Sequence, residues 1–326
     1  MYMKLPIIET NFREIERIPT GLYSFDHSIP FQNNIGLPLN IITEMYGREH
    51  IGKSTLAYYL SGVVAKHIAP DGVISLCDFE GLDISYLAHA VGMGGFEGTV
   101  KTIDPVDVKG KARSHEDMLG EFVTTLKDEK TSCGIVDSIG AIQTTEEEAS
   151  NLEEGFSAKR AVIVSKFVRK LNSLMRAKET PVNAFLINHA HTAVMGFGHN
   201  SSGGVALKHL AILRIFMSPS SADNIKSGDD VLANVVEGRI EKLRYGGNGG
   251  RFKFVTIPGY GVRSNLTAVI DCIDLGIVSR GSTIKMDDKS FGYFSGLVQA
   301  DLEDRVDKFE PFFEALKKYK KEEGSV

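Results

Sequence analysis

The sequence predicts an α/β fold in which a mostly parallel central sheet carries helices on both faces, with a small C-terminal α+β appendage. Two patterns predict it. Short apolar, β-branched runs alternate with segments of helical periodicity, and beyond residue 261 the chain changes to short elements and a charged helical stretch over 302–321. The composition agrees, because 42% hydrophobic and 24% charged residues exclude collagen-like, coiled-coil and wholly disordered chains.

Strands and amphipathic helices alternate along the first 260 residues. Apolar, β-branched runs predict strands over 37–45, 73–79, 133–137 and 182–188, and further strands are expected over 211–217 and 235–243. Apolar residues at helical spacing predict helices over 54–66, 82–91, 114–127 and 158–175. Ser114 and Asp117 form a capping-box pattern at the start of the third of these helices. We therefore expect a short N-terminal segment (1–20), a core (21–260) and the appendage (261–326).

Cysteine usage, hydropathy and charge limit the cellular compartment and the partners that the sequence predicts. Cys77, Cys133 and Cys272 lie inside apolar segments without a CxxC pair, which favours a reducing cytoplasm over a disulfide framework or a structural zinc. No run approaches the roughly 18–20 apolar residues that span a bilayer, so no membrane partner is expected. The net charge of −5 gives no overall attraction for nucleic acid, so DNA binding would need a local surface or its repetition.

Residues 47–54 (GREHIGKS) fit the spacing GxxxxGK[ST] of a phosphate-binding loop. In such a loop, Gly47 and Gly52 allow a tight path, and backbone N–H groups surround the phosphates. Lys53 supplies a point charge, and Ser54 can hold magnesium. The alternative is a glycine-rich turn with an exposed lysine. The phosphate loop is favoured because a predicted strand precedes the motif and a predicted helix follows it.

Carboxylates follow the next predicted strands. Asp137 closes the run CGIVD, where it could hold magnesium through water, although a turn aspartate is the alternative. Glu80 follows the strand over 73–79 and could orient or deprotonate an attacking water, and the alternative is a solvated loop glutamate. Asp83 and Tyr86 lie one helical turn apart just beyond. A ring with an acceptor would suit adenine, but a helical tyrosine is more often a core residue.

In this order and spacing, the motifs resemble the RecA recombinase family over residues 20–296. Segment 47–56 (GREHIGKSTL) resembles the family's GPESSGKTTL, 78–86 (DFEGLDISY) resembles DAEHALDPxY, and 135–138 (IVDS) resembles VVDS. The resemblance implies a RecA-like P-loop ATPase core that uses ATP and Mg²⁺. It assigns catalysis to Glu80 and Lys53, and the metal to Ser54 and Asp137. The implied ATP contacts are Gly47, Arg48, Glu49, His50, Ile51, Gly52, Lys53, Ser54, Thr55, Asp83 and Tyr86.

Two further segments are similar to family motifs that couple subunits and DNA to ATP. Asn188 and His189 stand at the family's INQ sensor, where histidine replaces glutamine. Neutral imidazole keeps one donor and one acceptor, so switching is still possible but becomes pH-sensitive. Segment 240–244 (IEKLR) resembles VVKNK, which implies that Lys242 and Arg244 reach the ATP of the neighbouring subunit.

The resemblance also implies a DNA-binding surface. Ser165 and Arg169 match family DNA-contact positions, and Arg160 lies on the same polar-basic face, although each could be ordinary helix surface. Gly203 and Gly204 open the segment GGVALK, which resembles the GGNALK that closes the family's DNA loop. Residues 190–204 contain no Lys or Arg, unlike the family's usual loop, so contacts there would rest on backbone amides and polar side chains.

The preferred function is an ATP-dependent recombinase. It would bind single-stranded and double-stranded DNA, assemble into a helical filament or a ring, and hydrolyse ATP during homologous pairing, strand exchange and repair. A recombination mediator is a possible partner. The alternative is an accessory or regulatory paralogue that binds ATP and a recombinase without exchanging strands. The uncharged loop and His189 favour it, as does His209, which stands where the family has a phenylalanine that packs into the neighbouring subunit. A hexameric helicase or clock-type ATPase fits the GGVALK segment and the adenine pair less well.

Overall fold

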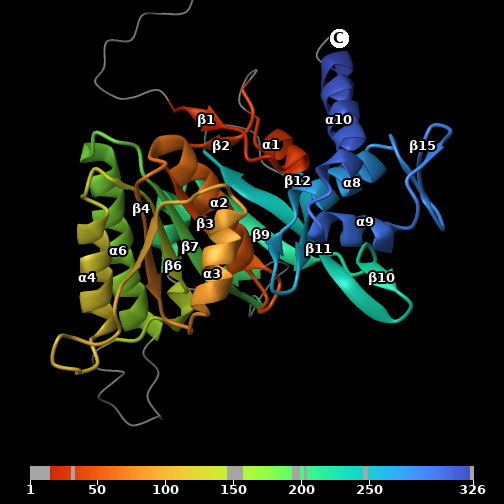
Figure 1. The fold of residues 1–326 in the computed structure, drawn as a ribbon. Helices are drawn as coiled ribbons and strands as arrows, with labels where there is room; N and C mark the ends of the chain where they lie inside the picture. The colour runs from red at the N-terminus through yellow and green to blue at the C-terminus, as the bar shows by residue number, and fades with distance from the viewer. Residues whose placement is uncertain are drawn as a thin grey trace, which may run out of the picture.

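The structure, a computed structural model, describes residues 15–30, 34–144, 157–192, 199–201, 204–244 and 249–323. Its described residues form an 11-stranded sheet (Figure 1). The strands on its main path, in spatial order, are β13 (Gly261–Val262), β12 (Arg251–Ile257), β11 (Asp230–Leu243), β9 (Leu213–Pro219), β3 (Ile42–Gly47), β7 (Asn183–Thr192), β6 (Thr131–Asp137), β4 (Val73–Asp78) and β5 (Thr99–Thr102). Two short strands complete it: β10 (Ile225–Ser227) pairs with β11, and β8 (His199–Ser201) pairs with β7.

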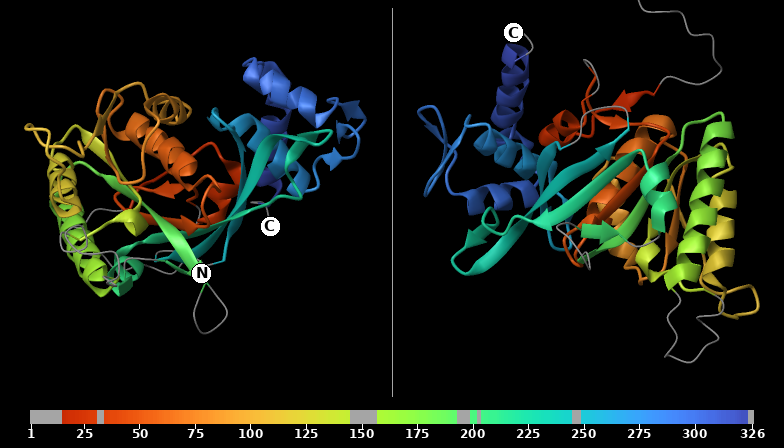
Figure 2. Two further views of the ribbon diagram at one scale, coloured as in Figure 1. Left: turned by 90° about the horizontal axis from the view of Figure 1, so that it is seen from below. Right: turned by 180° about the vertical axis from the view of Figure 1, so that it is seen from behind.

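The run from β9 to β5 is parallel throughout, and β11, β12 and β13 extend it with antiparallel pairings. Helices α2 (Lys53–Ile68) and α3 (Ile84–Gly92) cover one face, whereas α4 (His115–Thr125) and α6 (Ser157–Ala177) cover the other (Figure 1, Figure 2). Successive strand residues point to opposite faces, so Ile135 joins the apolar cluster under α2 and Val136 joins the cluster under α6. The predicted α/β fold, with a mostly parallel central sheet and helices on both faces, is confirmed.

Smaller elements connect and extend this core. They are β1 (Arg17–Ile18), α1 (Tyr23–Ser28), β2 (Leu37–Pro38), the 3₁₀ turn η1 (Ile139–Ala141) and α7 (Gly204–Leu210). After β13 come α8 (Ser264–Asp274), the hairpin strands β14 (Ser279–Arg280), β15 (Ile284–Met286) and β16 (Lys289–Ser290), then α9 (Phe294–Leu302), η2 (Val306–Lys308) and α10 (Glu310–Glu323). A third apolar cluster packs α8, α9 and α10 against residues of β11 and β12, so it is shared across the expected boundary at residue 260. That boundary stays a prediction.

Two of the expected elements are divided in the structure. The run over 37–45 is two strands rather than one, because Asn40 adopts φ 58° and interrupts the extended backbone between β2 and β3. Asparagine tolerates this left-handed conformation better than most residues. The stretch over 302–321 is also divided. Helix α9 ends at Leu302, Asp304 has φ 52°, and α10 begins only at Glu310.

No helix in the described part of the chain is both long enough and apolar enough to cross a membrane.

Candidate active site

Four parallel strands end together at one edge of the sheet. In the strand register, Gly47 at the end of β3 lies opposite His189 of β7, and Asp78 lies opposite Asp137 at the ends of β4 and β6. Polar groups that follow these strands therefore meet around one space. A cavity of about 540 Å³ opens there, lined by loop residues 49–55 together with Glu80, Asp137 and His189.

The loop over 47–54 has the geometry that its glycines predict. A Cβ on Gly47 would lie 2.4 Å from the carbonyl oxygen of Met217, so no larger residue fits beside β9. Gly52 has φ 86°, a conformation that L side chains rarely adopt, and helix α2 starts directly after it without a side-chain cap. The first N–H groups of α2 and its dipole therefore stay available to an anion at the cavity.

Lys53 is held inside the loop. Its side chain is 6% exposed, and Nζ donates a hydrogen bond to the carbonyl oxygen of Arg48 at 2.6 Å. Burial lowers the pKa of Lys53, while the carboxylates of Asp137, Glu80 and Glu49 oppose that change. A cation enclosed by three carboxylates lies where phosphate charge would be neutralised.

Asp137 offers an oxygen to the same space. The Tyr58 hydroxyl donates to its Oδ2 at 3.1 Å, whereas its buried Oδ1 finds no hydrogen-bond partner among the described residues. Burial raises the pKa of Asp137 to about 6, and the Ser54 and Tyr58 hydroxyls oppose the rise. An unsatisfied buried oxygen beside a serine hydroxyl fits a hydrated magnesium ion, since Mg²⁺ prefers oxygen ligands and retains several waters.

Glu80 lies in a small network with Ser138 and His189. His189 Nε2 is 2.7 Å from Glu80 Oε1 and 3.2 Å from the Ser138 hydroxyl, which also donates to Glu80. Burial favours a higher pKa for Glu80, but the hydrogen bonds from Ser138 and His189 and the charge of Lys53 outweigh it and lower the pKa. Glu80 is therefore a carboxylate at neutral pH, and one of its oxygens is in contact with a histidine.

Tyr86 and Asp83 occupy different positions. Tyr86 lines an adjoining cavity of about 300 Å³ with residues 50–52 and Thr55, and its hydroxyl is 2.6 Å from Thr55 Oγ1. The Asp83 side chain caps α3 by accepting a hydrogen bond from the Tyr86 backbone N–H at 3.0 Å, and it does not line the cavity. Only the tyrosine of the expected adenine pair borders this space.

The two expected sensor residues, Asn188 and His189, do not both border the main cavity. His189 borders the main cavity, whereas Asn188 is fully buried behind it and donates to Glu44 Oε1 at 2.9 Å. Glu44 forms an ion pair with Arg214 at 2.5 Å. Adjacent strand residues point to opposite faces, so only one of this pair can face the cavity.

Lys242 and Arg244 lie at the end of β11 and contact α7 of the same chain. Lys242 Nζ donates to the carbonyl oxygens of Lys208, His209 and Ala211 at 2.7, 2.9 and 2.7 Å. Arg244 Nη2 also donates to the carbonyl of His209. Both cations therefore bind the C-terminal end of the helix that follows the expected DNA loop, and neither lines the cavities at the phosphate loop.

The expected DNA contacts are spread over α6 and the start of α7. Arg169 is exposed, whereas the Ser165 hydroxyl donates to the carbonyl of Ala161 within its own helix at 2.6 Å. Arg160 donates to the carbonyl of Gly140 at 3.2 Å and lines a cavity of about 580 Å³ that also reaches His189 and the phosphate loop. Gly204 opens α7 with φ 78°, and Gly203 lies outside the described residues.

Sequence reasoning did not single out Tyr58 or Ser138. The sequence did contain a pattern that indicates Tyr58. This residue follows Ser54 by four positions and therefore lies one turn along the same face of α2. The contact of Ser138 with Glu80 joins residues 58 positions apart and depends on the turn after β6. No local pattern reports such a contact.

The known proteins that this chain resembles include RecA proteins of several bacteria. The family model described as the RecA N-terminal domain matches residues 2–248. The protein RecA of Bdellovibrio bacteriovorus is 26% identical over 90% of this chain and 71% of its own, and that of Fusobacterium nucleatum is 28% identical over 90% and 74%. The protein RecA of Ureaplasma parvum is 28% identical over 68% of this chain and 61% of its own.

Among solved structures, a crystal structure of the RadB recombinase has 18% sequence identity and a TM-score of 0.47, covering 70% of this chain and 92% of that one. The family model spans well over half of the sequence and includes every strand that ends at the candidate site. The chain belongs to the RecA family.

Proposed function

We propose that this RecA-family chain is an ATP-dependent recombinase that binds single-stranded DNA and assembles with copies of itself. One observation carries the proposal. Four side chains from separate segments border one cavity of about 540 Å³: Lys53 at the start of α2, Glu80 after β4, Asp137 at the end of β6 and His189 of β7. A cation, a helix N-terminus and two carboxylates in one space suit binding and hydrolysis of a nucleoside triphosphate.

ATP would bind with its phosphates in the loop over 47–54 and its base against Tyr86. Backbone N–H groups of the loop and Lys53 would hold the phosphates, with Ser54 and Asp137 holding Mg²⁺. When bound, the metal would neutralise charge on the transferring phosphoryl group. Glu80 would orient the attacking water and accept its proton, because its low pKa keeps it ionised.

His189 would report the state of the γ-phosphate. His189 Nε2 lies within hydrogen-bond distance of Glu80 Oε1, and His189 also borders the cavity that Arg160 lines. A phosphate that draws His189 away from Glu80 would free the carboxylate for water and shift the strand end that leads into the DNA loop. ATP and DNA would thus favour the same arrangement of β7.

Self-assembly would allow a chain with a net charge of −5 to bind DNA. Subunits stacked head to tail would present Lys242 and Arg244 to the ATP of the neighbour, and cations in trans stabilise a charged γ-phosphate. Repeating a modest DNA contact along a filament gives strong binding through multivalency. Double-stranded DNA as the second substrate, and homologous pairing and strand exchange, are parts of the same proposal.

The direct test measures ATP hydrolysis with and without single-stranded DNA, together with electron microscopy in a non-hydrolysable ATP analogue. We expect turnover that DNA stimulates and polymers that require nucleotide. Turnover that DNA leaves unchanged, without polymers, would exclude the recombinase proposal.

The second candidate is an accessory paralogue that binds ATP and a recombinase without exchanging strands. The three hydrogen bonds that tie Lys242 to its own α7 favour it, because an anchored lysine is not free to reach a neighbour. A strand-exchange assay separates the candidates. The accessory role predicts ATP binding without joint molecules, and stimulation of a partner recombinase when both proteins are present.

A further inference from the structure

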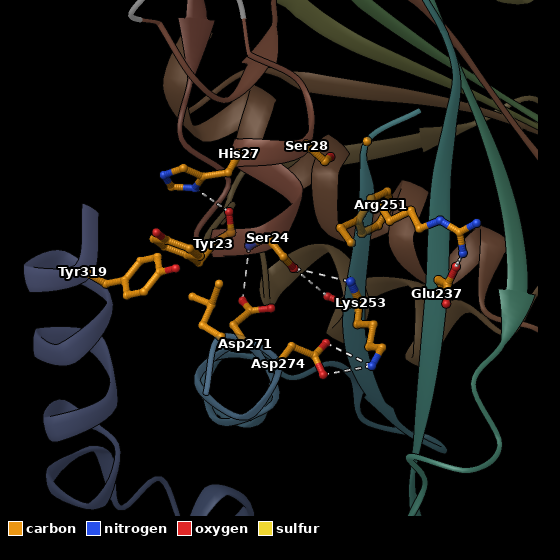
Figure 3. A pocket seen from close by; sticks show the side chains of 13 residues that line it. Tyr23, Ser24, His27, Ser28, Glu237, Arg251, Lys253, Asp271, Asp274 and Tyr319 are labelled. Atoms are coloured by element: carbon orange, nitrogen blue, oxygen red, sulfur yellow. Dashed lines mark hydrogen bonds and ion pairs between the residues drawn. The ribbon is translucent and has the colours of Figure 1, made fainter. Parts of the chain in front are cut away.

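A further cavity lies between α1, β12 and the C-terminal helices α8 and α10. It has a volume of about 480 Å³ and shares no lining residue with the cavities at the phosphate loop. We call it the junction cavity; its walls include Tyr23 and Ser24 of α1, Lys253 of β12, Asp271 of α8 and Tyr319 of α10 (Figure 3).

Most charges around the junction cavity are already paired. Arg251 contacts Glu237 at 2.7 Å, and Lys253 contacts Asp274 at 2.9 Å. Lys253 also contacts Asp223 at 2.9 Å, so two carboxylates surround its ammonium group. Each cation on the wall therefore has a carboxylate of its own, and a ligand gains little by replacing one.

Asp271 is the exception. Its side chain is 2% exposed and makes no ion pair with a described residue. Oδ2 accepts a hydrogen bond from the Ser24 backbone N–H at 3.2 Å, whereas the buried Oδ1 has no hydrogen-bond partner in the described part of the chain. Burial of a carboxylate that makes no ion pair is costly and raises its pKa to about 7, although the hydroxyl and backbone N–H of Ser24 and the charge of Lys253 oppose the rise. A positively charged donor would satisfy both its charge and its open oxygen.

Aromatic rings complete the surroundings of Asp271. Tyr23 of α1 and Tyr319 of α10 point toward each other beside this carboxylate, and the Tyr23 ring stacks on His27 with 3.9 Å between centroids (Figure 3). The face of a tyrosine ring attracts cations, and the attraction is stronger where the contact is shielded from water. Rings beside a lone carboxylate select a positively charged organic group over an anion.

We propose that the junction cavity binds an organic cation, an ammonium or guanidinium group, with Asp271 as its counter-ion and the rings of Tyr23 and Tyr319 as its walls. A free diamine and a lysine or arginine side chain of a partner protein carry the same chemistry. Because α1 and β12 belong to the core and α8 and α10 to the C-terminal elements, a bound cation would join the two parts.

Isothermal titration calorimetry of the whole chain at constant ionic strength tests the proposal with two probes, 1,4-diaminobutane and N-acetylarginine amide. Their neutral counterparts, 1,4-butanediol and N-acetylcitrulline amide, control for shape. We expect at least one cationic probe to bind and neither neutral probe to do so. Tighter binding of the diamine identifies a free small cation as the ligand, and tighter binding of the arginine derivative identifies a side chain.

Variants link binding to this cavity. Asp271→Asn keeps the shape of the side chain and should weaken the cation at least tenfold, whereas Asp288→Asn on the exposed β15–β16 turn should stay within twofold. If Asp271→Asn does not fold by circular dichroism, Tyr319→Leu on α10 replaces it, with an expected loss of about three- to tenfold. Absence of binding by both cations, equal binding of a neutral probe, or unchanged affinity in these variants would overturn the proposal.

Discussion

At the scale of single residues, the Glu80 carboxylate is held by two side chains of its own chain. Ser138 and His189 both contact its Oε1, and these bonds keep its pKa low. Both contacts are to Oε1, so the second carboxylate oxygen is the one that the proposed base would offer to a water. His189 therefore contacts the proposed base and borders the cavity at the phosphate loop at the same time.

Glu80→Gln tests this role. The amide keeps the size of the side chain but cannot accept a proton, so we expect ATP hydrolysis to fall by about 10²–10⁴-fold while ATP affinity changes only a few-fold. Steady-state hydrolysis and nucleotide titration measure the two quantities. Glu97→Gln, an exposed glutamate, is the matched control and should resemble the wild type. Equal turnover in both variants would remove Glu80 from the chemistry.

Buried carboxyls predict how stability depends on pH. Burial raises the pKa of Asp26 and Asp137 to about 6 and that of Asp271 to about 7, against an ordinary value of 3.8. Between these values the folded chain keeps protons that the unfolded chain has released. The free energy of unfolding therefore falls as pH rises from about 4 to 7, by up to roughly 1.4 kcal/mol per pH unit for each group.

Asp271→Asn should flatten this dependence, since asparagine has no proton to lose. We expect the variant to match the wild type near pH 4 and to exceed its unfolding free energy at pH 8 by a few kcal/mol. Urea unfolding at both pH values measures the difference, with Asp288→Asn as control. A variant that is less stable than the wild type at pH 8 would show that the charged form of Asp271 stabilises the fold.

At the scale of elements, Lys242 of β11 links the sheet to α7. A cation that donates to three carbonyls at a helix C-terminus satisfies groups that have no partner within the helix and opposes the negative end of its dipole. Helix α7 follows the expected DNA loop directly, so this anchor fixes one end of that loop. Release of Lys242 toward a neighbouring ATP would loosen this anchor, and in the proposed filament that release would couple ATP to the DNA loop.

Lys242→Met retains the apolar stem and removes the charge. We expect a loss of about 1.5–3 kcal/mol in stability, since hydrogen bonds from charged groups are the stronger ones. Hydrogen exchange should speed up in residues 204–211 and stay unchanged in α4 on the same face of the sheet. Arg244→Ala, which removes one such bond, should have a smaller effect. Unchanged exchange in α7 would show that the anchor contributes nothing to its stability.

The helices and strands, and the sheet edge that carries the candidate site, could be predicted from the sequence because the patterns that predict them are local. The spacing over 47–54, the strand-end position of Asp137 and the apolar periodicity of α2 each lie within one short segment. The ends of parallel strands then bring such segments together, as the pairing of Gly47 with His189 demonstrates.

What the sequence could not predict depends on contacts between distant segments or on single backbone torsions. Asn40 divides one expected strand because its backbone has a positive φ. Asp83 lies just before α3, which begins at Ile84, and its side chain caps that helix. The junction cavity needs Tyr23, Asp271 and Tyr319 together, which are nearly 300 positions apart at the extremes. Neither composition nor periodicity carries that information.

At the scale of the whole molecule, the central claim is that each ATP is gripped by one chain and completed by the next. Lys53→Ala removes the grip, and Arg244→Ala removes the completing cation, so each variant alone should lack DNA-stimulated hydrolysis. Nucleotide titration should show that Arg244→Ala still binds ATP as a separate chain, whereas Lys53→Ala does not.

Mixing the two variants is the most direct measurement. A phosphate loop from the Arg244→Ala chain beside an arginine from the Lys53→Ala chain rebuilds a complete site, and random head-to-tail assembly at equal amounts places about a quarter of the sites in this arrangement. We predict that DNA-stimulated hydrolysis recovers to about that fraction of wild-type activity. Hydrolysis no greater than the sum of the two variants measured separately would contradict a site shared between chains.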